Sequence, residues 1–409
     1  MFRMAKMDVS AFSKSPSPQY SEDEFLQIWK AKITNITQAW DEYRRGEMNP
    51  TSLPFKGILE LTQNCNFKCY MCPQSMEPKF AKYNNALNMP AELFVRLAEE
   101  FFPTATFVDL RGFGESTILP WWDDVLTYLE RFPFVNWHLV TNLGVPRAAM
   151  WERMIRLGFE LGFSCDGATQ ETFEAIRVHS RFPTILNNLE AIKQARRKFK
   201  NRGYIYFIST IQKGNIRELR KIVEMAHKYE VGEVQFKAVQ GAPWQPELYS
   251  ISDDEVALFV SQAVDCALEL KVNVNFNDHF FTKNIDPVKV KRVNEFPRLS
   301  VSNFHPFDQD FWMVNKMPEI MNQIIDSSRV SVHQKCFKPF SFTYVNYEGL
   351  MGTCNHMMFP DLRVMGDLNK NSFKEIWNSE KYVQFRKELW MAKPSDPRCQ
   401  WCFKHRLAD

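Results

Sequence analysis

Short apolar runs alternate with helical stretches between residues 55 and 239. The apolar runs are rich in β-branched and aromatic residues. This alternation is typical of consecutive strand–helix units, which build a parallel sheet. It predicts six strands, at residues 57–62, 106–111, 136–141, 159–164, 204–211 and 233–239.

Helix-start signals stand between these strands, mostly a proline or a capping residue near the first helical position. They predict helices that begin near Met89-Pro90, Pro120-Trp121, Pro146-Arg147, Thr169-Gln170, Phe182-Pro183 and Asn215. Because six strands are too few to close an eight-stranded barrel, we expect an α/β fold with an open, partial (β/α)6 barrel of the TIM type. The functional groups of such barrels gather at the carboxyl ends of the strands.

The segments before and after this barrel show other patterns. Residues 1–52 form a leader, in which Ser21-Glu22-Asp23-Glu24 has the form of a capping box at the start of a helix. Residues 53–240 would hold the barrel. Residues 241–332 are expected to form a mostly helical or irregular insertion or linker, and its clearest element is a helix from Asp253 to Leu270.

Residues 333–409 are expected to form a small α+β domain. Residues 340–346 alternate as a strand, and Glu348-Gly349 is typical of a hairpin turn that returns the chain alongside this strand. Residues 367–392 then have the pattern of a helical return path.

Composition narrows the class of protein. A chain of 409 residues predicts two or three domains, and 45% apolar with 24% charged residues is ordinary for a soluble protein. A formal net charge of +3 is too small for a nucleic-acid footprint. The N-terminus lacks an apolar signal segment, and no later segment approaches about eighteen unbroken apolar residues. We therefore expect a protein that binds neither nucleic acid nor membranes.

Cysteine usage indicates metal binding rather than disulfides. Seven of the nine cysteines fall into two sets with metal-like spacing, which a secreted disulfide framework does not show. The compartment should therefore be reducing, and we expect the cytoplasm. The other two, Cys165 and Cys266, stand at apolar positions and are expected to pack in the core.

The first cysteine set directly follows the apolar run from Gly57 to Leu61. Cys65, Cys69 and Cys72 have the spacing Cys-x3-Cys-x2-Cys. Three thiolates can hold three corners of a cubic iron–sulfur cluster and leave the fourth iron open for chemistry, whereas structural zinc takes four closed ligands. A zinc knuckle and a redox-sensing cysteine cluster remain the alternatives.

Polar residues follow the second and third predicted strands. Gly114 would let the backbone approach a ligand, and Glu115 offers a carboxylate to an ammonium group. Thr141 and Asn142 offer hydrogen-bonding groups at the end of the third strand. Turns of this composition also occur without any ligand.

The fourth strand has two faces of different character. Its period of two places Gly162, Ser164 and Asp166 on one face and Phe163 with Cys165 on the other. We expect the small and polar face to point into the barrel and Cys165 to pack under the helices.

These features, in this order along the chain, resemble the radical S-adenosylmethionine (SAM) enzymes. The resemblance implies that the open iron holds the amino and carboxylate groups of SAM, and that the reduced cluster cleaves SAM to a 5'-deoxyadenosyl radical. It also implies an electron donor such as flavodoxin or ferredoxin. The family's "GGE" motif binds the amino group of SAM, and Phe113-Gly114-Glu115 is similar to it, with Phe113 in place of a glycine.

The resemblance implies further SAM contacts. The segment from Ser164 to Arg177 resembles the family's SAM-contacting fourth strand and the following helix, so Ser164 and Asp166 would bind the ribose hydroxyls and Arg177 would pair with the SAM carboxylate. Thr141 and Asn142 would bind that carboxylate or the substrate. The implied cofactor-binding residues are Met71, Gly114, Glu115, Thr141, Asn142, Ser164, Asp166 and Arg177.

The second cysteine set consists of Cys336, Cys354, Cys399 and Cys402. The predicted hairpin brings the first two together, and four thiolates close a cluster, so this site should transfer electrons or brace the fold without binding SAM. The arrangement resembles the twitch or SPASM auxiliary-cluster domain and implies a second [4Fe-4S] cluster. A full SPASM domain has further cysteines, and because the chain stops at Asp409 we expect the shorter twitch form. A four-cysteine zinc ribbon is the alternative.

The resemblance defines the cofactor chemistry better than the substrate. We expect hydrogen abstraction followed by a net oxidation of a small-molecule natural product or a carbohydrate, because no peptide-docking domain is visible. The alternatives are SPASM-type peptide modification, transfer of the SAM aminocarboxypropyl group and, outside catalysis, a zinc-held structural protein. No catalytic base is assigned, although His333, His356 and Asp278 are candidates by position.

Overall fold

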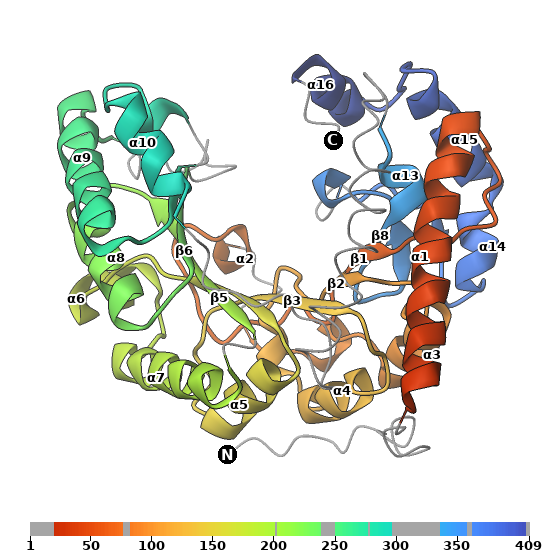
Figure 1. The fold of residues 1–409 in the computed structure, drawn as a ribbon, viewed down its shortest axis with the longest axis horizontal. Coiled ribbons are helices and arrows are strands. Elements are labelled where there is room, and N and C mark those ends of the chain that lie inside the picture. The colour runs from red at the N-terminus through yellow and green to blue at the C-terminus, as the bar shows by residue number, and fades with distance from the viewer. Residues whose placement is uncertain are drawn as a thin grey trace.

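A computed structural model describes residues 20–76, 82–200, 203–238, 250–276, 279–296, 336–357 and 362–405. Within these ranges, ten strands form one sheet in the order β10-β9-β8-β1-β2-β3-β4-β5-β6-β7 (Figure 1). The strands are β1 (Lys56–Leu59), β2 (Phe107–Asp109), β3 (Asn136–Thr141), β4 (Glu160–Ser164), β5 (Tyr204–Ile211), β6 (Glu233–Ala238), β7 (Val274–Phe276), β8 (Phe342–Val345), β9 (Leu350–Gly352) and β10 (Gly366–Asp367).

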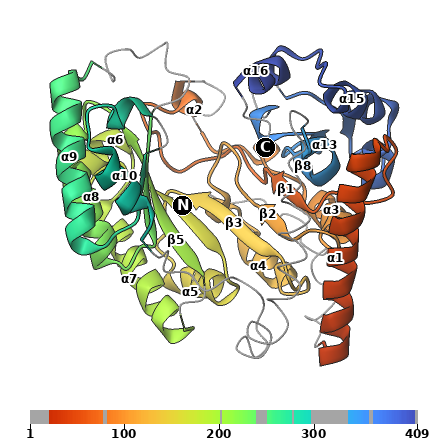
Figure 2. The same cartoon turned by 45° about the horizontal axis from the view of Figure 1, so that its top comes forward.

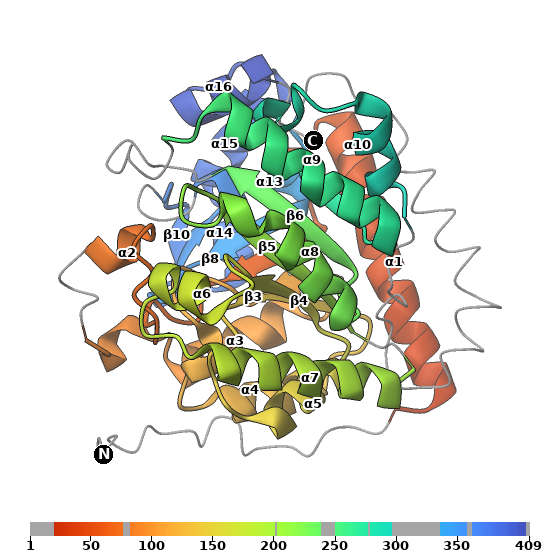
Figure 3. The same ribbon diagram turned by 90° about the vertical axis from the view of Figure 1, so that its left-hand side faces the viewer.

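Helices follow most of the strands, as the sequence predicts for strand–helix units. Figure 3 shows α8 and α9 side by side at one end of the sheet. The helices are α1 (Glu22–Arg45), α2 (Pro73–Met76), α3 (Ala91–Phe101), α4 (Trp122–Leu129), α5 (Ala148–Arg156), α6 (Gln170–Ile176), α7 (Phe182–Lys198), α8 (Leu219–Lys228), α9 (Asp253–Leu270), α10 (Pro287–Asn294), α13 (Lys338–Ser341), α14 (Phe373–Trp377), α15 (Glu380–Trp390) and α16 (Pro397–His405).

All six predicted strands are confirmed, and they pair in parallel in chain order from β1 to β6. The segment from residue 241 adds a strand that the sequence did not predict, since β7 pairs in parallel with β6. Three residues are too few for a recognisable period of two. Residues 297–335, which include most of the remaining predicted insertion or linker, lie outside the described residues.

The C-terminal segment extends the same sheet on its other side. β8 pairs in parallel with β1, with Lys56 opposite Phe342 and Leu59 opposite Val345. The predicted hairpin is confirmed, because β9 pairs antiparallel with β8 and Gly349 has a φ of 87°, a conformation that favours glycine. Figure 2 shows the strands continuing from β5 to β8. The sheet does not close within the described residues, which confirms the open barrel.

The two faces of the sheet differ in polarity. Val108, Leu139, Phe163, Phe207 and Phe236 are fully buried on the face that helices α3 to α8 cover. The opposite face, which we call the inner face, carries polar residues at the alternate positions, among them Asp109, His138 and Tyr206. Period-two side chains therefore direct polar chemistry into the barrel.

Helix α1 joins the barrel to the C-terminal segment, and Figure 1 shows it beside α13 and α15. It begins with the predicted capping box of Ser21 and Glu24. The buried Lys32 ammonium donates to the backbone oxygens of Phe102 and Ala105 on the barrel. At its other end, the ring of Trp40 stacks on Phe337 with 3.8 Å between centroids. Among the described helices, none has the length and apolar character needed to cross a bilayer.

Candidate active site

The loop from Cys65 to Cys72 leaves the carboxyl end of β1 and is held on both sides. The Lys68 amide donates to the backbone oxygen of Val178 over 2.9 Å. The Phe67 ring packs so closely on Gly144 that a Cβ there would lie 2.6 Å from it. Cys69 is buried and the other two cysteines are half-buried. The loop therefore has a defined path across the ends of the strands.

Hydrogen-bond donors contact two of the three sulfurs of this loop. Cys65 Sγ accepts from the Phe67 amide at 3.5 Å and from Asn142 Nδ2 at 3.7 Å. Cys69 Sγ accepts from Arg177 Nη1 at 3.6 Å. Burial, with a contribution from the Glu115 charge, raises the pKa of Cys65 to about 12. Burial also raises the pKa of Cys69, against the opposing effect of Arg177. Metal binding at this loop would therefore release protons.

The donor set fits an iron–sulfur cluster better than a single ion. In the described part of the chain, no three His, Cys, Asp or Glu side chains converge on one point. A single zinc requires every sulfur at about 2.3 Å from the same atom. In a cubic cluster each thiolate binds its own iron, and hydrogen bonds to the sulfurs tune the potential.

The predicted Gly114-Glu115 motif is clamped against this loop. A Cβ at Gly114 would lie 2.3 Å from the Asn64 backbone oxygen, so only glycine fits. The buried Glu115 carboxylate accepts from Thr141 Oγ1 at 2.8 Å and from the Asn142 amide at 2.7 Å. Burial raises the pKa of Glu115, although these hydrogen bonds oppose the shift. The carboxylate thus ties the turn after β2 to the end of β3, and its contact with a SAM ammonium group remains a prediction.

The two predicted residues at the end of β3 have different surroundings. The Thr141 hydroxyl donates to Glu115 on the side of the turn. Asn142 Nδ2 lies beside the cysteine loop, where it donates to Asn66 Oδ1 over 2.8 Å as well as to Cys65. Asn142 is therefore the one of the pair that reaches the candidate cluster site directly.

The fourth strand has the two faces that its period predicts. Cys165 and Phe163 are fully buried in the core, whereas Asp166 lies on the inner face. Asp166 Oδ2 accepts from Arg177 Nε at 2.7 Å, and its other oxygen accepts from the Thr210 amide at 2.7 Å. This carboxylate thus holds the guanidinium that contacts Cys69.

The remaining predicted positions are placed more loosely. Ser164 is half-buried at the last position of β4. Met71 is half-buried and packs on the edge of the core. Of the candidate bases, His333 and Asp278 lie outside the described residues, and His356 lies in the 3-10 helix Asn355–Met357.

The sequence reasoning missed a polar network on the inner face, deeper in the barrel. Asp109 Oδ2 lies 2.7 Å from Arg111 Nε and 2.9 Å from His138 Nδ1. His138 Nε2 hydrogen-bonds the Tyr206 hydroxyl over 2.8 Å. Tyr206 reaches across β4 because Gly162 leaves room, since a Cβ there would lie 2.8 Å from the hydroxyl. A period-two reading of β2, β3 and β5 would have placed these polar residues on the face of Ser164.

The second cysteine set lines one cavity that is partly open to solvent. We call this cavity the auxiliary site. Cys336, Cys354, Cys399 and Cys402 contribute to its wall together with Lys338, Arg398 and apolar side chains. Burial raises the pKa of both Cys336 and Cys399 to about 12. The structure thus brings together the four thiols that the sequence grouped.

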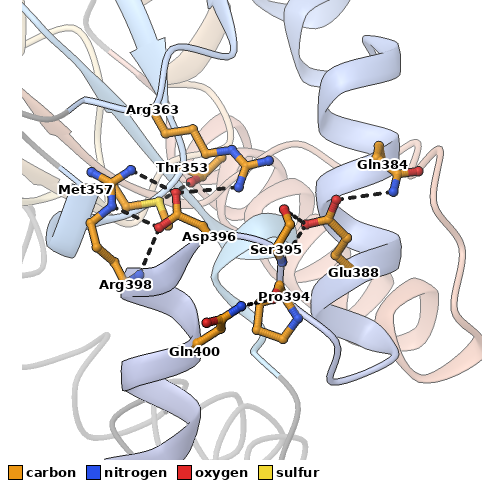
Figure 4. Close-up of polar contacts among 10 residues, drawn as sticks. All are labelled: Thr353, Met357, Arg363, Gln384, Glu388, Pro394, Ser395, Asp396, Arg398 and Gln400. Carbon is orange, nitrogen blue, oxygen red and sulfur yellow. Dashed lines mark hydrogen bonds and ion pairs between the residues drawn. The ribbon is translucent and has the colours of Figure 1, made fainter.

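Asp396 positions the helix that carries two of these thiols (Figure 4). Its Oδ1 accepts from the Arg398 amide at 2.9 Å at the start of α16, and its Oδ2 lies 2.8 Å from Arg398 Nη2. Arg363 Nη1 approaches the same oxygen to 3.6 Å. The carboxylate therefore fixes both the start of α16 and the Arg398 side chain at the wall of the cavity.

Comparison with known proteins identifies the family. The model of the radical SAM superfamily matches residues 59–226, and that of the SPASM iron-sulfur cluster-binding domain matches residues 336–403. The chain is a radical SAM enzyme with a C-terminal SPASM-type domain. No curated protein sequence matches it.

Solved structures of two related enzymes share the fold. SuiB from Streptococcus suis bound to SAM has a TM-score of 0.56 and 12% identity, over 90% of this chain and 74% of SuiB. The enzyme anSMEcpe with bound AdoMet has a TM-score of 0.53 and 16% identity, over 87% of this chain and 85% of that protein. At these identities the likeness concerns the fold alone.

Family membership defines the cofactors. A radical SAM domain uses SAM and a [4Fe-4S] cluster, and a SPASM domain carries auxiliary iron–sulfur clusters. The expected enzyme class and cofactors are thereby confirmed, and the zinc-held structural protein loses its support.

Proposed function

We propose that this protein cleaves SAM reductively at a cluster held by Cys65, Cys69 and Cys72 and abstracts hydrogen from a peptide. The loop of three thiols, with donors on two of the sulfurs and no fourth cysteine in the motif, carries this proposal. When bound there, a cluster with one open iron supplies the electron that cleaves SAM.

Several residues of this chain would bind and orient SAM. Asn142 and Arg177 already contact the cysteine sulfurs and would therefore stand beside a bound cluster. Gly114 and Glu115 would receive the ammonium group, and Arg177 would offer its terminal nitrogens to the carboxylate. Ser164 and Asp166 would face the ribose, Met71 would contact the bound cofactor, and Thr141 would keep Glu115 in place.

The comparisons favour a peptide over the small-molecule substrate that the sequence suggested. SuiB is known in a complex with its precursor peptide SuiA, at a TM-score of 0.54 over 90% of this chain. The structure of anSMEcpe with bound AdoMet and Cp18Cys peptide matches with a TM-score of 0.50 over 87% of this chain. The sequence favoured a small-molecule substrate only because no peptide-docking domain was visible. That is weaker support than a fold shared with two enzymes that are known in complexes with peptides.

Arg111 is the member of the inner-face network available to such a substrate. Its side chain is 36% exposed, whereas Asp109, which holds it, is 2% exposed. We assign Arg111 to substrate contact, because a guanidinium fixed by a buried carboxylate is preorganised for a polar partner.

Deuterium transfer tests the proposal. The fully reconstituted enzyme would be incubated under anaerobic conditions with SAM, a reductant and a deuterated peptide encoded beside its gene. We expect 5'-deoxyadenosine that contains deuterium from the peptide, and none from a variant with Cys65, Cys69 and Cys72 all replaced by Ala. SAM cleavage with deuterium acquired only from a labelled sugar or other small molecule would refute the peptide assignment.

A further inference from the structure

Helix α1 places a tyrosine next to the auxiliary site. The Tyr43 ring lies 5.0 Å from that of Phe337 and 5.2 Å from that of Phe340, between centroids, and Phe337 directly follows Cys336. Tyr43 is 1% exposed. Within the described part of the chain, its hydroxyl has no hydrogen-bond partner.

A buried hydroxyl without a partner destabilises the fold, which points to an acceptor that a bound group would supply. Burial raises the pKa of Tyr43, and the charge of Cys336 adds a smaller contribution in the same direction. A thiolate or sulfide at the auxiliary site would supply this acceptor, because Phe337, which packs on the Tyr43 ring, directly follows Cys336. The orphaned hydroxyl thus fits a cluster bound at Cys336.

Lys338 adds positive charge at the same corner of the auxiliary site. It lines the cavity, and its Nζ lies 3.3 Å from Asn355 Oδ1 and 4.8 Å from the centroid of the Phe342 ring. In the described part of the chain it forms no ion pair, so its charge is not neutralised by a carboxylate.

The other charges around the auxiliary site do not cancel that of Lys338. Asp396, whose charge acts on Cys399, faces both Arg398 and Arg363. The charge around the barrel site has the opposite sign. Glu115 lies near Cys65 there, and the positive charge of Arg177 is paired with the negative charge of Asp166. Positive charge and hydrogen bonds to sulfur favour the reduced form of a cluster.

We propose that Tyr43 and Lys338 raise the reduction potential of the auxiliary cluster, so that it accepts the electron of a substrate radical. The substrate gives one hydrogen atom to the 5'-deoxyadenosyl radical. A cluster held at the auxiliary site would take one further electron from the substrate, and with the loss of one proton to solvent this would complete a two-electron oxidation. An external carrier of the flavodoxin or ferredoxin type removes the electron from the cluster. The direction of electron flow rests on the proposed function, whereas the tuning of the potential does not.

A redox titration tests whether the two residues raise the reduction potential of the auxiliary cluster. It needs neither SAM nor peptide, so it remains valid even if no peptide substrate is found. The full-length protein with both clusters would be titrated and followed by electron paramagnetic resonance. The Cys65, Cys69 and Cys72 triple Ala variant shows which signal belongs to the auxiliary cluster. We expect Lys338→Met to weaken reduction about tenfold, a shift of about 59 mV to lower potential. Tyr43→Phe should shift the potential in the same direction.

A charge-matched control separates tuning from a general effect of net charge. Lys374 is exposed on α14, which contributes no residue to the cavity wall. Lys374→Met removes the same charge and should leave the potential unchanged. If Tyr43→Phe and Lys338→Met shift the potential no more than Lys374→Met, or if the site shows no redox signal, the inference is wrong.

Stability distinguishes tuning from a structural role of the tyrosine. Tyr43→Phe removes a hydroxyl that lacks a protein partner, so it should not destabilise the metal-free chain but should destabilise the loaded protein. Tyr382→Phe is the matched control, because the Tyr382 hydroxyl donates to the Gly352 backbone oxygen over 3.0 Å. This control should lose stability in both forms. Equal losses for Tyr43→Phe in both forms would indicate packing alone.

Discussion

Replacing Asp166 by Asn tests the network that supports the candidate SAM site. Asp166 has no exposed surface, and its two oxygens bind Arg177 and the Thr210 amide. Asn has nearly the same volume and can still accept the Thr210 bond. The substitution therefore removes one negative charge and leaves the guanidinium, with 13% of its side chain exposed, without a counter-charge.

The structure sets the expected magnitude. Removing one partner of a buried ion pair costs about 3–5 kcal/mol, because an uncompensated charge remains in the interior. Since the Arg177 side chain keeps some contact with solvent, we expect a loss near the lower limit, about 3 kcal/mol. The freed guanidinium should also move from Cys69 and weaken SAM binding.

Denaturant unfolding of the anaerobic protein measures the first effect, and equilibrium SAM binding measures the second. Glu152→Gln is the matched control, because its pair with Lys198 is 43% and 62% exposed. Exposed pairs contribute about 0–1 kcal/mol, so this control should change little. A loss below about 1 kcal/mol for Asp166→Asn, with SAM affinity intact, would show that the pair does not support the site.

Three further predictions concern the clusters and the inner face. Anaerobically prepared protein should bind about eight irons in two cubic clusters, which iron and zinc analysis checks, and a colourless zinc-loaded protein would contradict this. Replacing Cys399 and Cys402 by Ala should preserve SAM cleavage but abolish product, seen as uncoupled 5'-deoxyadenosine, and full turnover would make these thiols structural. Gly162→Ala should displace Tyr206, because the new Cβ would lie 2.8 Å from its hydroxyl. We expect a loss of about 1–3 kcal/mol on thermal unfolding, and parental stability would mean that the ring moves freely.

The sequence by itself determined the features that short segments encode. Six strands followed from apolar runs, and the two faces of β4 followed from its period of two. Gly349 identified the hairpin because its positive φ suits glycine. The cysteine spacing indicated a three-thiol site that leaves one iron free and a four-thiol site that leaves none. The number of protein ligands decides whether an iron remains free. These signals are local, so neighbouring residues were sufficient to read them.

Only the tertiary structure decided which distant segments meet. The pairing of β8 with β1 joins residues far apart in sequence, and no periodicity records such a contact. The sequence predicted that Glu115 and Arg177 contact SAM. The structure shows in addition that Glu115 accepts a hydrogen bond from Thr141 and that Arg177 donates one to Asp166. The packing of Tyr43 on Phe337 and Phe340 depends on how α1 packs against α13. Such partners are set by long-range packing and burial, because a side chain acquires its charge environment only when the whole chain has folded.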